Sequence, residues 1–211
     1  MNKAKKHTNL VLILFFIFLF PLAAKSSTDL SDASSGPKEI VRSFQSSLLE
    51  TMKNSENTNI SQRYENLVPN VQKAFHFPLM IQIASGNYWQ QASKSERLDL
   101  VNAFQRMSIM TLATLFSGYS GEKFNVLGEK KGPQKTTLVD TELIKSDKSK
   151  ISIVYVTRQF KSGWRIIDVI VDKGISELLV RRSEYKQTLK SGGVPSLIKL
   201  LNNKASEISS Q

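Results

Sequence analysis

ISIVYVTRQFKSGWRIIDVIV, residues 151–171, contains two strands and the turn between them. Residues of high β-propensity fill 151–160 and 164–171, and Lys161-Ser162-Gly163 is typical of a turn. So short a connection joins antiparallel neighbours. Neither face of 164–171 is purely polar, which predicts a sheet that is covered on both sides or lines a cavity on one.

Outward from this stretch, alternation predicts further strands at 124–126 and 136–144, so we expect an antiparallel sheet of about four strands. Helical spacing predicts helices over 38–52, 61–75, 77–84, 94–116, 184–189 and 195–201. Pro69 could break or kink the second helix, Ser93 and Glu96 form a capping box, and Gly192-Gly193 separates the last two helices. Helices, then strands, then helices predict an α+β domain with helices packed on one sheet face.

The first 26 residues predict the cellular compartment of the protein. Lysines precede the apolar run 10–20, and Pro21 and small residues follow, as in a secretory signal peptide. The run is too short for a spanning helix, so we expect cleavage, placed after Ser26. We therefore assign 1–26 to the signal peptide, 27–37 to a flexible leader, 38–203 to a single domain and 204–211 to a C-terminal tail. Export predicts a periplasmic protein.

Charge and composition limit the functional classes. The formal net charge of +11 falls to +7 when Lys3, Lys5, Lys6 and Lys25 leave with the signal. A basic exported chain fits an anionic membrane surface or an acidic partner, and solubility alone is an equally good explanation of its charge. No basic block of five residues occurs, so nucleic acid is not an expected partner. The chain has no cysteine, which excludes disulfides and thiol chemistry.

Side chains suited to catalysis are few. The chain has two histidines, and His7 lies in the signal segment. We interpret His76 as a structural or surface residue. Asp168, between apolar neighbours on a strand, is either a base in a pocket or a structural carboxylate. We therefore expect no catalytic residue, no metal site and no cofactor.

Several motifs together carry a family resemblance. They are Tyr88-Trp89, Ser93 with the helix 97–104, GWRIIDV at 163–169, Gly174-Ile175-Ser176, and Arg182-Ser183-Glu184-Tyr185. In order and spacing they resemble the MlaC, or toluene-tolerance, family of periplasmic phospholipid-binding components of lipid ABC transport systems. The last motif is also similar to the HpnM branch, which is associated with hopanoid lipids.

The resemblance implies an NTF2-like fold, in which helices and a curved sheet enclose acyl chains in an apolar cavity. It also implies a carrier that shuttles lipid between an inner-membrane ABC transporter complex and an outer-membrane lipoprotein complex. We further expect a monomer with transient membrane-surface contact. From the strand and helix patterns we expect eight residues to contact the lipid tails: Tyr88, Phe104, Leu112, Phe116, Val139, Ile153, Tyr155 and Ile166. Arg181 and Arg182 are candidates for head-group or partner contact, and a solvated surface position explains them at least as well. Two alternatives stay open: an exported NTF2-like enzyme that uses Asp168, and an envelope adaptor that binds no lipid.

Overall fold

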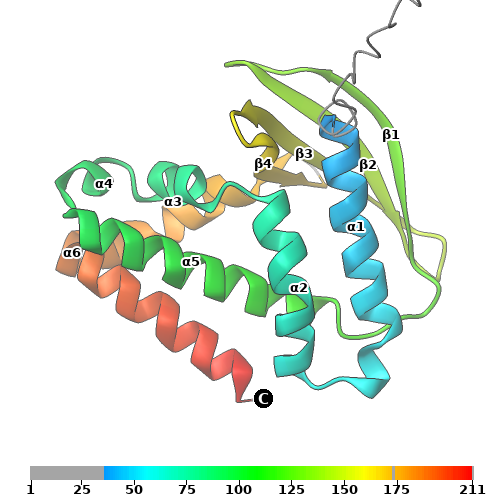
Figure 1. Cartoon of the computed structure of the whole chain (residues 1–211), viewed down its shortest axis with the longest axis horizontal. Coiled ribbons are helices and arrows are strands. Elements are labelled where there is room, and N and C mark those ends of the chain that lie inside the picture. The colour runs from blue at the N-terminus through cyan, green and yellow to red at the C-terminus, as the bar shows by residue number, and fades with distance from the viewer. Residues whose placement is uncertain (1–35, 173, 211) are drawn as a thin grey trace, which may run out of the picture. The chain divides into compact units, whose positions relative to one another are not determined.

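A computed structural model describes residues 36–172 and 174–210 (Figure 1). The predicted signal peptide and most of the predicted leader lie outside this range. The helices are α1 (Pro37–Lys53), α2 (Ile60–Ala74), α3 (Phe77–Ser85), α4 (Asn87–Gln91), α5 (Lys94–Leu115) and α6 (Glu177–Ser209), with a 3₁₀ turn at Ser55–Asn57. The strands are β1 (Lys123–Lys131), β2 (Thr136–Ile144), β3 (Lys150–Phe160), β4 (Gly163–Val171) and β5 (Ile175–Ser176). The expected α+β class is confirmed.

The sheet is an antiparallel meander in the order β1-β2-β3-β4-β5, curved and unclosed. Strand β1 is longer than the predicted 124–126, because its charged C-terminal half lies at a solvent-exposed edge where alternation no longer marks a strand. The register shifts between Val126 and Gly128, and Leu127 at this bulge is 63% exposed. The short β5 was also absent from the predicted set.

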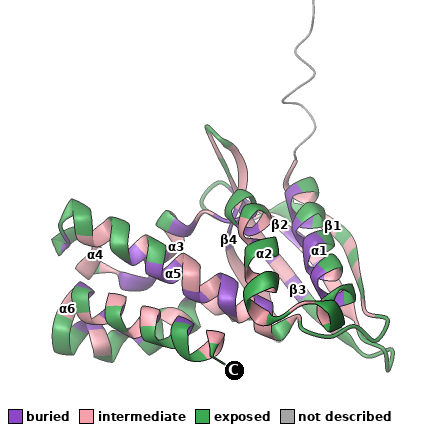
Figure 2. Ribbon diagram, turned by 60° about the horizontal axis from the view of Figure 1, so that its bottom comes forward, coloured by how far each residue is buried: buried purple, intermediate pink, exposed green. Residues whose placement is uncertain are grey.

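Helix α1 lies across one face of the sheet, which we call the inner face (Figure 1). Pro37 begins the helix, where its missing N–H costs nothing. The predicted stripe of Ile40, Phe44, Leu48 and Met52 is buried. Figure 2 shows buried positions gathered between α1 and the strands and along α5, with exposed positions outside. The expected placement of helices on a sheet face is therefore confirmed.

The next four helices extend the molecule beyond the sheet. Helix α2 runs through Pro69 unbroken, and α3 ends at Gly86, whose φ of 57° stops the helix. The capping box of Ser93 and Glu96 begins α5, as predicted. Helix α4 was not predicted, because five residues are too few to show a helical period.

Helix α6 has two arms, 177–191 and 194–209, that meet at a sharp change of direction (Figure 1). Gly192 and Gly193 have non-helical backbone angles, in agreement with the separation read from the sequence. The arms are longer than the predicted 184–189 and 195–201, and residues 204–209, assigned above to a tail, continue the second arm. In the described ranges, no helix combines the length and the apolar character that crossing a bilayer requires.

Candidate functional site

Five buried aromatic rings connect the inner face of the sheet to α5. Tyr155 lies 6.0 Å from Phe44, and Phe44 lies 4.9 Å from Phe75, both edge to face. Phe75 stacks on Phe77 at 5.8 Å, and Phe77 meets Phe104 at 5.9 Å. We call this set the aromatic chain. It contains no charged side chain, so the interior along it suits hydrocarbon rather than polar ligands.

Five of the eight predicted tail contacts border or belong to this interior: Phe104, Val139, Ile153, Tyr155 and Ile166. Val139 lies opposite Tyr155 in the β2–β3 register, and Ile166 bridges to Phe75. All five are at most 8% exposed. These side chains therefore pack against one another, and a ligand can enter only where they separate.

The remaining three predicted contacts lie outside this buried set. Leu112 and Phe116 are half-buried at the end of α5, where Phe116 faces Phe124 of β1 at 6.4 Å. Tyr88 belongs to α4, which packs on α3 and α6 at the far end of the helical layer from the sheet (Figures 1 and 2). The structure thus brings five of the eight together, leaves two beside them and separates Tyr88.

A buried polar group lies between α1 and the inner face. Gln45 Nε2 donates to Thr141 Oγ1 at 3.2 Å and to the Tyr155 hydroxyl at 3.5 Å, and Thr141 Oγ1 donates to the Ile153 carbonyl at 2.8 Å. Burial raises the pKa of Tyr155 to about 12, so its hydroxyl stays protonated. Sequence reasoning missed Gln45, because a polar residue beside Phe44 reads as solvent-facing.

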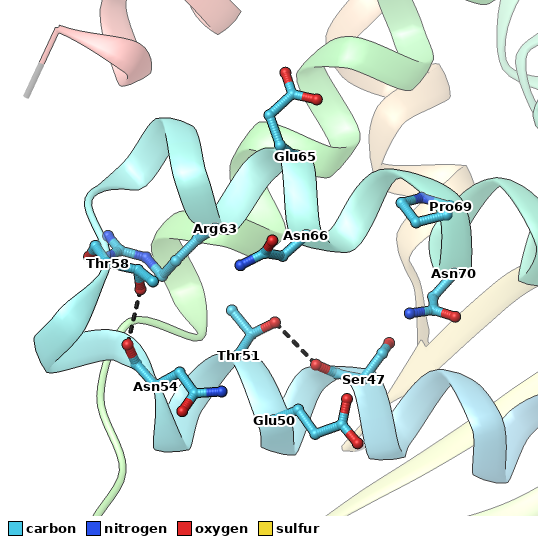
Figure 3. Close-up of a pocket in the computed structure, with 10 residues that line it drawn as sticks. All are labelled: Ser47, Glu50, Thr51, Asn54, Thr58, Arg63, Glu65, Asn66, Pro69 and Asn70. Atoms are coloured by element: carbon cyan, nitrogen blue, oxygen red, sulfur yellow. Dashed lines mark hydrogen bonds between the residues drawn. The ribbon is translucent and has the colours of Figure 1, made fainter.

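A pocket of about 380 Å³ separates α1 from α2 (Figure 3). Its lining is Ser47, Glu50, Thr51, Asn54, Thr58, Arg63, Glu65, Asn66, Pro69 and Asn70. Figure 3 shows Asn70 pointing toward α1 and Glu65 pointing away from it. The hydrogen-bonding groups suit a small polar molecule, and none of the predicted tail contacts lines this pocket.

A second pocket, of about 320 Å³, lies between α3, α4 and the first arm of α6. Arg182, a predicted head-group or partner contact, lines it. Arg181, the other candidate, pairs with Glu184 at 2.9 Å. The two neighbouring arginines therefore have different environments.

Asp168 has a structural position. Val169 N and Leu178 N donate to its Oδ1 at 2.8 and 3.0 Å, and Ser176 Oγ donates to Oδ2 at 2.6 Å. Both carboxylate oxygens thus hold the start of α6 against β4. Asp168 lines neither pocket. Within 36–172 and 174–210, no cluster of three metal-ligating side chains occurs.

The model of the MlaC protein family matches residues 42–203, which is most of the chain and nearly all of the described domain. The chain belongs to the MlaC family. The expected family is thereby confirmed, while the HpnM branch stays a prediction.

A solved structure shares the fold of this MlaC family member. It is a phospholipid-binding protein from Ralstonia solanacearum in complex with a phospholipid, with a TM-score of 0.73 and 16% identity. The match covers 83% of this chain and 99% of that protein. Among curated proteins, none matches the sequence. At this identity the likeness establishes the fold, and the expected NTF2-like arrangement of helices on a curved sheet is confirmed.

Proposed function

We propose that this MlaC family protein is a periplasmic lipid carrier that binds the acyl chains of a phospholipid, or of a hopanoid-type lipid, between α1, the inner face and α5. The observation that carries the proposal is the family match over 42–203. The Ralstonia protein, which has the same fold, was solved with a phospholipid, and this supports the choice of ligand. The predicted signal peptide at 1–26 supports the periplasmic location.

Elementary energetics supports binding without catalysis. Burial of hydrocarbon contributes about 0.8 kcal/mol for each CH₂, so one long acyl chain supplies ample affinity. The aromatic chain and its aliphatic neighbours offer the apolar surroundings that such a chain needs. Because these side chains pack closely in the structure, we infer that loading separates α1 from the inner face.

Release is the harder step for a carrier. A tightly held lipid leaves only when a partner favours a state with lower lipid affinity. We propose that an inner-membrane ABC transporter complex and an outer-membrane lipoprotein complex provide this difference, and that the protein shuttles between them as a monomer.

The two alternatives have less support. An enzyme that uses Asp168 needs a carboxylate facing a substrate, whereas both oxygens of Asp168 bind groups at the start of α6. An adaptor that binds no lipid predicts a permanently filled interior. The experiment below separates the adaptor from the carrier.

The deciding experiment is mass spectrometry of organic extracts from the mature protein, purified from its native envelope without detergent. We expect one lipid species at near-stoichiometric amount. Ile153→Trp, which adds bulk to the inner face, should lower the lipid content severalfold. Val154→Trp is the matched control, because the next residue of β3 points to the opposite face.

Both variants should first be shown to fold by circular dichroism and cooperative unfolding. A folded wild-type protein that is reproducibly free of lipid would contradict the proposal and favour the adaptor. Equal lipid loss in the two tryptophan variants would show that the lipid does not lie on the inner face.

A further inference from the structure

The pocket between α3, α4 and the first arm of α6 is lined by hydrogen-bond donors without a carboxylate. Its lining is Leu79, Gln82, Ile83, Gly86, Asn87, Trp89, Gln90 and Arg182. Three side-chain amides and one guanidinium supply N–H donors, and no carboxylate belongs to the lining. Such a surface favours an anionic group.

Arg182 is the charged member of this pocket, which we call the Arg182 pocket. Its guanidinium makes no ion pair or hydrogen bond with another residue in the described ranges, unlike that of Arg181. Its Nη2 lies beside Gly86, where an added Cβ would be 3.7 Å away, an ordinary van der Waals contact. An exposed guanidinium with its donors unused is well suited to a carboxylate, which it can bind in a bidentate manner.

The same pocket has an apolar side. Leu79, Ile83 and Trp89 are half-buried in its wall, and Leu179, three residues before Arg182 on α6, is 61% exposed. Arg97 fixes α4 beside the pocket, because its Nε donates to the Trp89 carbonyl at 2.8 Å and its guanidinium lies 5.5 Å from the Trp89 ring. Apolar and cationic groups therefore lie side by side on a firmly held surface.

The Arg182 pocket is also distinct from the interior assigned to the lipid, since the two share no lining residue. Helix α4 lies at the opposite end of the molecule from the strands in both views (Figures 1 and 2). None of the five residues bordering the aromatic chain lines the pocket. A group bound here would leave the interior free.

We propose that the Arg182 pocket docks an acidic segment of a partner protein, with an Asp or Glu carboxylate on Arg182 and an adjacent apolar side chain on Leu79, Ile83 and Trp89. The proposal rests on the carrier function, because a carrier needs a docking surface that leaves its cargo in place. The formal net charge of +7 that remains after loss of the four signal-peptide lysines from +11 favours approach of an acidic partner.

The test is photo-crosslinking in the native envelope. p-Benzoylphenylalanine replaces Asn87, an exposed residue of the pocket wall, in the full-length protein, and crosslinked peptides are sequenced by mass spectrometry. We expect a partner segment in which Asp or Glu adjoins apolar residues. Arg182→Glu should lower the crosslink yield about tenfold, as expected for reversal of a contacting charge.

Lys199→Glu is the matched control. It makes the same change in net charge at an exposed position on the second arm of α6, and it should leave the yield within about twofold of wild type. The proposal is overturned by no crosslinked protein, by crosslinks to lipid alone, by a basic or uncharged partner segment, or by equal losses in the two variants.

Lipid content of the Arg182→Glu protein separates this proposal from the carrier function. We expect it to equal that of wild type. An Arg182-dependent crosslink in a protein without lipid would contradict the carrier function and preserve the docking site. Lipid-loaded protein with the same crosslink yield in wild type and Arg182→Glu would contradict the docking site and preserve the carrier function.

Discussion

At the scale of single residues, His76 joins α3 to the sheet. Its Nδ1 accepts a hydrogen bond from Leu79 N at 3.1 Å, and its own backbone N–H donates to the Ile166 carbonyl at 2.9 Å. The imidazole stacks on Phe160 with 4.0 Å between ring centres. Burial lowers the pKa of His76, and the nearby Arg165 adds to the effect. The ring is thus built into the structure in its neutral form.

This arrangement predicts a pH dependence of stability. Because the folded pKa lies below the unfolded value of about 6.5, the stabilising contribution is present above that value and is lost as the pH falls through the folded pKa. We expect the free energy of unfolding in urea to decrease from pH 7.5 to pH 5.0. His76→Asn keeps a capping acceptor that does not titrate, so this variant should show a smaller decrease. An equal decrease in both proteins would contradict the assignment of this pH dependence to His76.

Two buried tyrosines make a second prediction at this scale. The Tyr185 hydroxyl has no hydrogen-bond partner among the described residues, whereas that of Tyr155 accepts from Gln45. Tyr185→Phe should therefore change the free energy of unfolding by less than about 0.5 kcal/mol, or raise it, and Tyr155→Phe should lower it by about 1 kcal/mol. Urea unfolding of both variants tests this, and the opposite order would refute it.

At the scale of elements, the junction in α6 determines where its second arm lies. Gly193 has φ 64° and ψ −160°, a conformation that is essentially restricted to glycine. A Cβ on Gly192 would collide with Ser196 Oγ. Gly193 is therefore required by the backbone conformation, and Gly192 by the lack of space for a Cβ.

Alanine substitutions test this junction. Gly193→Ala should lower the free energy of unfolding by about 1–3 kcal/mol because of backbone strain. Gly118→Ala is the control, since nothing lies within 4 Å of its added Cβ and its φ is not positive. A loss in the control as large as that in Gly193→Ala would mean that the measurement reports a general effect of replacing glycine and not strain at the junction.

The capping box of α5 makes a prediction for a helix terminus. Ser93 Oγ accepts from Glu96 N at 3.2 Å, and Ser93 N donates to Glu96 Oε2 at 2.8 Å. Ser93→Ala should lower the free energy of unfolding by about 1 kcal/mol, and Ser93→Asp should restore most of it, because aspartate also caps. Thermal unfolding measured by circular dichroism suffices, and no difference between the two variants would argue against capping.

At the scale of the whole molecule, the C-terminal arm closes the helical layer. Leu201 and Ala205 are fully buried, and Arg106 of α5 donates to Ser206 Oγ at 3.3 Å. Residues 204–209 therefore contribute to the domain, although their sequence resembles a polar tail.

Truncation tests this contribution. Deletion of 204–211 should lower the midpoint of urea unfolding, because it removes Ala205 from the core and one of the two hydrogen-bond partners of Arg106. Deletion of 210–211 alone should leave the midpoint unchanged. Equal midpoints for the two truncated proteins would show that the end of the second arm does not stabilise the fold.

Local sequence patterns were enough to predict the order of the main elements. Ile40, Phe44, Leu48 and Met52 recur at helical spacing, and 151–171 alternates around a tight turn, so each element follows from neighbours a few residues apart. Local hydrogen-bonding groups did the same for a helix start, at Ser93 and Glu96. Elements without a period, such as α4, or with a charged edge, such as β1, gave no comparable signal.

Which side chains meet became clear from the packing of the elements and not from local patterns. Gln45 contacts Thr141 and Tyr155, which are 96 and 110 residues away, and Arg182 reaches a pocket whose other walls are α3 and α4. This packing also separated Tyr88 from the other predicted contacts and engaged both oxygens of Asp168. The physical reason is that periodicity records which face of an element is buried, whereas the partner of that face depends on how distant elements pack.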